Sequence, residues 1–108
     1  MKNKLHYSPE ALNDLNEIWE YVANDAENEN VANHLVSSIF HTIDQLESFS
    51  ALGPTLYSVT GRTNEYRYLV SGNYLVFYRT IYENVYIDRI IHSRRDYMRI
   101  LFDEKLGE

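Results

Sequence analysis

Apolar residues recur along the first half of the chain at the spacing of an amphipathic helix. The first stripe consists of Leu12, Leu15, Trp19 and Val22. Intervals of three and four residues predict one apolar helix face, and we expect Trp19 to be buried between the helices and a sheet. Ser8 and Pro9 predict where this helix begins, because serine caps a helix and proline suits its first position. Residues 5–8 form a candidate strand before it.

A second apolar stripe follows the polar segment at residues 24–30. It consists of Leu35, Ile39, Ile43 and Leu46, with Val36 and Phe40 beside it. This stripe predicts a helix over residues 31–49, and Gly53 and Pro54 then stop the pattern. Because the polar connection is short, we expect the two helices to form an antiparallel hairpin.

The pattern changes to that of β-strands in the second half of the chain. Residues 65–70 and 74–80 are rich in aromatic and β-branched side chains. Gly72 between them predicts a hairpin turn, because glycine readily adopts the positive φ that tight turns need. Residues 85–92 predict a third strand of this sheet, and residues 55–59 predict an extra edge strand.

The predicted order β-α-α-β-β-β indicates an α+β fold, with the N-terminal strand and the helical hairpin packed on one face of a mainly antiparallel sheet. We expect the other face of the sheet to be free, and Leu101 and Phe102 to close the core. A chain of 108 residues fits one domain. We place this domain at residues 1–102 and a short C-terminal tail at residues 103–108.

Charge is divided unevenly between the two halves of a chain whose formal net charge is −6. Residues 1–50 carry two lysines against nine acidic residues, whereas residues 53–101 carry seven arginines, no lysine and four acidic residues. Arginine suits planar, bidentate contact with carboxylates or phosphates, so the second half is predicted to bind an anionic group. Internal ion pairs are the alternative for any single arginine, but four carboxylates are too few for all seven.

Composition also limits the chemistry that we expect. The chain has no cysteine, so it forms neither disulfides nor thiolate metal sites. His34 and His41 are seven residues apart, which is no metal-ligand signature, and we expect neither a metal nor a cofactor. No segment has the apolar core of a signal peptide or the length of a transmembrane helix, so we expect a cytoplasmic protein without membrane contact.

Three segments, in this order, resemble the RelE/ParE superfamily of type II toxin–antitoxin toxins: SPEALNDLNEIWEYVA, YLVFYRT and VYIDRIIHSRRD. The first resembles the family's opening strand and helix, and the second its central strand, which ends here in Tyr78 and Arg79. The third ends in HSRRD, residues 92–96, as is typical of the ParE branch. The resemblance implies a small toxin that a cognate antitoxin binds and silences, in a heterotetramer or a higher complex.

Two activities are known in this superfamily, and the resemblance alone implies either. ParE-like members inhibit DNA gyrase by protein–protein contact, and the candidate partner-binding residues here are Arg62, Arg67, Arg79, Arg94, Arg95 and Arg99. RelE-like members cut mRNA on the ribosome without a metal, which needs a base, an acid and cations around the phosphate. The candidates for that chemistry are His92, Arg79, Arg62, Arg67 and Tyr97.

We favour the ParE-like, gyrase-directed activity for three reasons. No lysine lies between Leu5 and Glu104, although RNA-cleaving relatives usually carry lysines on their middle strands. The net charge of −6 opposes general attraction to nucleic acid, and the HSRRD ending is ParE-like. A degenerate, non-toxic relative that acts only as a binding partner is a second alternative. For His92 itself, a structural role at the strand end is the simpler interpretation, with Asp96 accepting hydrogen bonds from Arg94, Arg95 or His92 to fix the turn.

Overall fold

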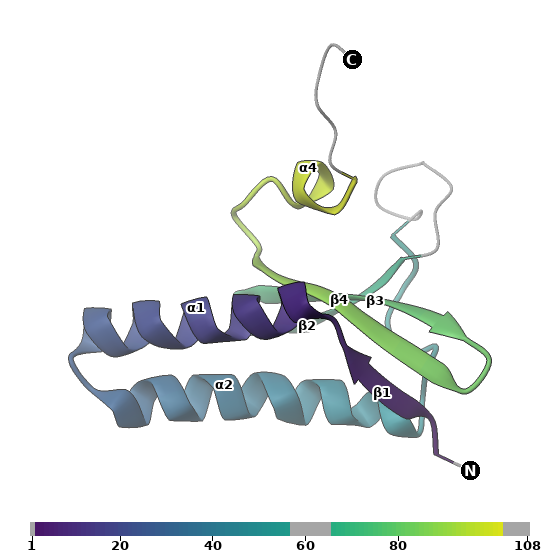
Figure 1. The fold of residues 1–108 in the computed structure, drawn as a ribbon, viewed down its shortest axis with the longest axis horizontal. Helices are drawn as coiled ribbons and strands as arrows, with labels where there is room; N and C mark the ends of the chain where they lie inside the picture. The colour runs from purple at the N-terminus through teal and green to yellow at the C-terminus, as the bar shows by residue number, and fades with distance from the viewer. Residues whose placement is uncertain (1, 57–65, 103–108) are drawn as a thin grey trace.

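The computed structural model describes residues 2–56 and 66–102 (Figure 1). Its elements are β1 (Lys4–Tyr7), α1 (Pro9–Ala26), α2 (Glu29–Asp44), the 3-10 helix η1 (Gln45–Glu47), β2 (Arg67–Ser71), β3 (Tyr74–Ile81), β4 (Asn84–His92) and α4 (Tyr97–Phe102). The four strands form one sheet in the order β1-β4-β3-β2. β1 runs parallel to β4, whereas the β2–β3 and β3–β4 pairs are antiparallel. The α+β fold with a mainly antiparallel sheet is therefore confirmed.

The helical hairpin packs on one face of this sheet and forms the main core there. This core contains Ala11, Leu15, Ile39, Ile43, Leu46, Leu69, Val76, Tyr78, Val85, Ile87 and Ile90. Ser8 joins the helical layer to the sheet, because its hydroxyl accepts from the Ala11 amide at 2.9 Å and donates to the Asp88 carbonyl at 2.8 Å. The predicted cap therefore starts α1 and also fastens it to β4.

The buried face of α1 differs from the predicted stripe. Ala11, Asp14 and Leu15 are buried, whereas Leu12 is 52% exposed. Trp19 is only half-buried and donates from Nε1 to Asn33 Oδ1 at 2.7 Å, so it bridges α1 and α2 near their surface. The prediction that Trp19 is buried between the helices and the sheet is therefore wrong. A spacing of three or four residues suits either of two adjacent faces, and packing against β4 selected the one that contains Asp14.

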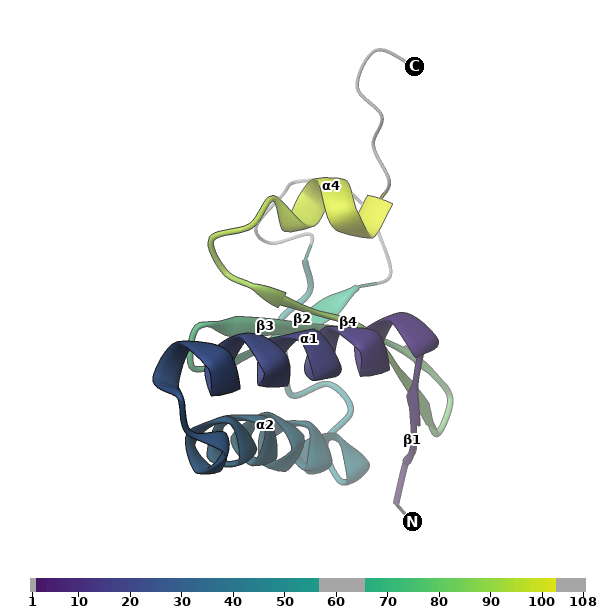
Figure 2. The same cartoon turned by 60° about the vertical axis from the view of Figure 1, so that its left-hand side comes forward.

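The opposite face of the sheet is not free, contrary to expectation, because α4 packs on it (Figure 2). A second cluster forms between them around the buried side chains of Leu56, Phe77 and Ile91. Leu101 and Phe102 pack against this cluster, as predicted for core-closing residues. The molecule therefore has three layers, with the helical hairpin and α4 on opposite sides of the sheet (Figures 1 and 2).

Gly53 and its neighbours connect the helices to the edge of the sheet. A side chain at Gly53 would place its Cβ 2.1 Å from the Tyr68 carbonyl oxygen, so only glycine fits this close approach. Thr55 then pairs with Arg67 in a single antiparallel bridge, which matches the start of the predicted edge strand. The rest of that strand, residues 57–59, lies outside the described residues. No helix in the described ranges is long and apolar enough to span a membrane.

Candidate functional site

The candidate site lies after β4, in residues 93–96, which we call the arginine turn. His92 supports this turn, because its Nδ1 accepts from the Arg94 backbone amide at 3.1 Å and its carbonyl accepts from the Arg95 amide at 3.0 Å. The Asp96 carboxylate accepts from the Arg99 backbone amide at 3.2 Å and thereby caps α4. The expectation that Asp96 accepts from Arg94, Arg95 or His92 is wrong, since the start of α4 uses its carboxylate.

Backbone hydrogen bonds thus hold the arginine turn and leave its guanidinium groups directed to solvent. Arg94, Arg95 and the neighbouring Arg99 of α4 are all exposed. None of the three guanidinium groups forms an ion pair with another residue of the described ranges. The acidic molecule therefore presents a concentrated positive surface at this end, available to a partner that carries carboxylates or phosphates.

A cleft of about 670 Å³ lies beside the arginine turn, between α1 and the end of the sheet. Ile18, Val22 and Leu35 contribute apolar side chains, and Arg95 and His92 line it from the strand side. Tyr74 also lines this cleft, and burial, together with the nearby Tyr21, raises the pKa of its phenol. The cleft is mostly apolar and meets the arginine turn at one rim.

Arg89 is used structurally, in an ion pair between α1 and β4 that the sequence did not predict. Arg89 donates from Nε and Nη2 to the two Asp14 carboxylate oxygens, at 2.8 and 2.9 Å. Asp14 is only 6% exposed and also accepts from the Ile90 amide at 2.9 Å. The hydrogen bond with Asp14 raises the pKa of Arg89. Asp14 lies between Ala11 and Leu15 on the buried face of α1, and no local sequence signal marks it, because an alanine and an aspartate add little to an apolar stripe.

The Ile90 amide needs Asp14 because of where β1 ends. β1 pairs with β4 only as far as Tyr7 and Ile87, so no strand of the described ranges continues along that edge of β4. β4 also contains a bulge, since Phe77 pairs with Arg89 and Tyr78 pairs with Ile87, which leaves Asp88 unpaired in the register. The Asp14 carboxylate of α1 therefore accepts the hydrogen bond that a neighbouring strand would otherwise accept from the buried Ile90 amide.

Two further candidate arginines also interact within the chain. Arg79 on β3 forms an ion pair with Asp88 at 2.6 Å, and its guanidinium lies 5.7 Å from the ring centroid of Tyr86. Arg67 on β2 donates from Nη1 to the Gly53 carbonyl at 2.7 Å. Arg62 lies outside the described residues. We therefore retain Arg94, Arg95 and Arg99 as the partner-binding candidates, because their guanidinium groups form neither an ion pair nor a hydrogen bond with another described residue.

The residues considered for RNA cleavage do not converge on one site. His92 pairs with Tyr74 and Arg79 lies five residues further along β3, a separation of about 17 Å along the strand. Their side chains also point to opposite faces of the sheet, since Tyr74 packs with the helical hairpin and Phe77, two residues before Arg79, packs under α4. Tyr97 stacks on Phe77 with ring centroids 5.4 Å apart, inside the second cluster. The described residues thus place His92 far from Arg79, whereas Tyr97 lies on the same face of the sheet as Arg79.

Comparisons with known proteins agree with this arrangement of elements. The family model described as "ParE toxin of type II toxin-antitoxin system, parDE" matches residues 5–97. A solved structure described as "Chromosomal ParDE TA system from P. aeruginosa" is similar with a TM-score of 0.71 and 18% sequence identity. That similarity covers 84% of this chain and 96% of the other, and at this identity it shows the fold alone. The search of curated proteins found no match.

The match of the family model includes the opening strand, the helical hairpin, the three later strands and the arginine turn. It therefore runs from the second residue of β1 to the first residue of α4. The chain belongs to the ParE family of toxins of type II toxin–antitoxin systems.

Proposed function

We propose that this ParE-family toxin inhibits DNA gyrase by protein–protein contact in the cytoplasm and is neutralised by a cognate antitoxin. The observation that carries the proposal is the arginine turn, whose guanidinium groups are exposed without an ion pair to a described residue. Arginine is enriched among residues that dominate binding at protein interfaces. The separation of His92 from Arg79 supports contact with a target in preference to cleavage of RNA.

The antitoxin part of the proposal rests on family membership and on the similar solved structure, which is that of a ParDE system. We propose that toxin and antitoxin associate as a heterotetramer or a higher complex. An antitoxin that covered the arginine turn would silence the toxin by blocking access to its target. Measuring the mass of the complex of the two purified proteins by light scattering tests the stoichiometry.

The experiment that tests the target is a gyrase assay with purified toxin free of antitoxin. We expect the wild-type protein to inhibit supercoiling and to trap double-strand cleavage complexes. Arg94→Ala and Arg95→Ala should each raise the half-inhibitory concentration about tenfold, because each removes an exposed cationic contact. Lys2→Ala is the matched control, since it removes one exposed positive charge from the segment before β1.

A folded but inert wild-type protein in this assay would contradict the gyrase proposal. Site-specific cuts in mRNA that disappear in His92→Ala would replace it with ribosome-dependent RNA cleavage. Normal growth after strong induction, with soluble protein confirmed and no antitoxin present, would instead show a non-toxic binding partner.

A further inference from the structure

The sheet contains two hairpin loops of the same length that differ in their first residue. In the β2–β3 loop this residue is Gly72, with φ +60°. In the β3–β4 loop it is Tyr82, with φ 54°. Two-residue hairpin loops favour positive φ at this position, which glycine adopts without steric cost. Tyr82 therefore holds a left-handed backbone conformation that its own side chain disfavours.

Tyr82 gains no compensating contact for its side chain within the described residues. Its side chain is 92% exposed, and it makes no hydrogen bond or ring contact with another described residue. Glu27, the other non-glycine residue with positive φ in the described ranges, is different. It ends α1, where its amide donates to the Ala23 carbonyl. The backbone strain at Tyr82 is not compensated by a contact within the described residues, which points to a role of Tyr82 in binding another molecule.

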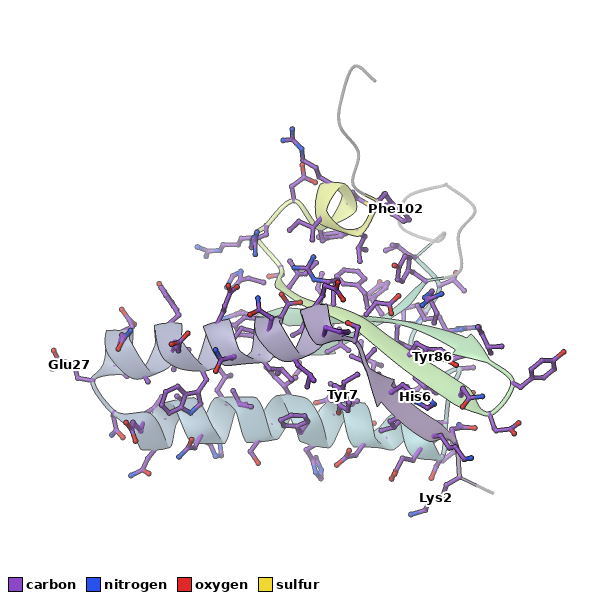
Figure 3. All side chains as sticks on the ribbon, viewed as in Figure 1. Lys2, His6, Tyr7, Glu27, Tyr86 and Phe102 are labelled. Carbon is purple, nitrogen blue, oxygen red and sulfur yellow. The ribbon has the colours of Figure 1, made fainter. Side chains whose placement is uncertain are left out.

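The β3–β4 loop is apolar at its tip and is supported by packed side chains below it. Ile81 beside it is 45% exposed, so the tip carries two adjacent apolar side chains. Below the tip, the ring of His6 stacks on Tyr86 at a centroid distance of 4.9 Å (Figure 3), and Arg79 lies against the same tyrosine. The paired hairpin fixes the backbone that carries Tyr82, and an aromatic side chain has only two rotatable side-chain bonds, so little freedom is lost on binding. Tyrosine is also one of the residues that most often dominate interface energetics.

The loop lies at the opposite end of β4 from the arginine turn (Figure 1). Asn84 and His92 bound this strand, so the two surfaces are about 27 Å apart along it. Charge near the tip is balanced, because Asp88 pairs with Arg79, and Lys4 of β1, whose amide donates to the Glu83 carbonyl at 2.8 Å, brings one positive charge beside Glu83. An apolar tip with balanced charges suits a protein surface better than a nucleic acid.

We propose that Tyr82 is an anchor for the protein that this toxin inhibits, and that its ring enters an apolar pocket of that target. The inference rests on the proposed function, because it assigns a second contact point for the same protein–protein inhibition. The target then meets the toxin at both ends of β4, through the arginine turn and through the β3–β4 loop.

The test compares Tyr82→Gly, Tyr82→Asn and Tyr82→Phe with the wild type in the gyrase assay, in growth arrest after induction and in thermal unfolding. Glycine and asparagine both tolerate the left-handed conformation, so neither should lower the unfolding temperature. Both should raise the half-inhibitory concentration at least about tenfold and weaken growth arrest, because they remove the ring. Tyr82→Phe keeps the ring and should stay within about threefold of wild type. Phe49→Ala removes a different aromatic side chain, 65% exposed, and should behave as wild type.

The outcomes separate this inference from the proposed function. Wild-type potency in Tyr82→Gly and Tyr82→Asn overturns the anchor and leaves gyrase inhibition standing, even if antitoxin binding is weakened. A loss in Tyr82→Phe equal to that in Tyr82→Gly overturns the apolar pocket. If the wild type arrests growth without inhibiting gyrase, the gyrase proposal fails, and the growth of the variants decides the anchor. If the wild-type protein neither inhibits gyrase nor arrests growth, both the proposed function and the Tyr82 anchor are overturned.

Discussion

At the scale of single residues, Asp14 shows how one buried carboxylate can serve several elements. It receives three hydrogen bonds, two from the Arg89 guanidinium and one from the Ile90 amide. These bonds join α1 to β4 just beyond the last pair between β1 and β4. The same contacts remove Arg89 from the set of arginines that can bind a partner.

Replacing Asp14 by alanine should lower the free energy of unfolding by about 3 kcal/mol, because Arg89 is then left partly buried without its partner and the Ile90 amide loses its acceptor. Chemical denaturation followed by circular dichroism measures this loss. Glu17→Ala, one turn further along α1 and exposed, is the control and should change stability by less than about 0.5 kcal/mol. A loss below about 1 kcal/mol in Asp14→Ala would show that the ion pair contributes little.

At the scale of elements, α1 shows the limit of predicting a helix face from spacing. The sequence correctly predicts a helix, its start at Ser8 and Pro9, and its hairpin with α2. The predicted stripe nevertheless includes Leu12, which is exposed, and omits Ala11 and Asp14, which are buried. An alanine and an aspartate carry little apolar signal, so only the position of β4 reveals that they lie inward.

The two leucines of the predicted stripe test this rotation of the helix face. Leu15→Ala should cost about 2–5 kcal/mol of stability because it leaves a cavity between α1 and the sheet. Leu12→Ala makes the same chemical change at a site that is 52% exposed, and should cost less than about 1 kcal/mol. Urea unfolding of both variants gives the comparison. Equal losses of stability in Leu12→Ala and Leu15→Ala would support the helix face that the sequence predicted.

At the scale of the whole molecule, acidic and basic residues belong to different parts of the layered fold. The helical hairpin carries most of the acidic residues, whereas the exposed Arg94, Arg95 and Arg99 gather where β4 passes into α4, with Arg95 at the rim of the cleft beside α1. α4 thus has two roles, since it covers Phe77 and Ile91 and also holds the arginine turn through Asp96. A target contact at this end therefore depends on the third layer.

Truncation tests the role of α4 in the folded molecule. A chain that ends at Asp96 should lose several degrees of thermal stability and bind a hydrophobic dye, because Phe77, Ile91 and Leu56 become exposed. A chain that ends at Phe102 is the control and also tests the predicted division between domain and tail, so it should unfold at the wild-type temperature. Dye binding equal to wild type in the shorter chain would show that α4 is dispensable for the core.

The elements on which sequence and structure agree are those with a local physical signal. Helical spacing, the Ser8–Pro9 start and Gly72 each act within a few residues, and together with the family motifs they determined the α+β fold and its toxin family. The arginine excess likewise predicted that this half of the chain binds an anionic partner, which remains a prediction.

Tertiary structure alone decided which of those arginines remain exposed. Arg67, Arg79 and Arg89 find partners that are 9 to 75 residues away in sequence, whereas Arg94 and Arg95 follow the last strand and find none among the described residues. It also separated His92 from Arg79, placed α4 over the second face and gave Tyr82 a left-handed backbone at an exposed tip. Each of these depends on strand register or on packing between layers, which are set by contacts between segments distant along the chain.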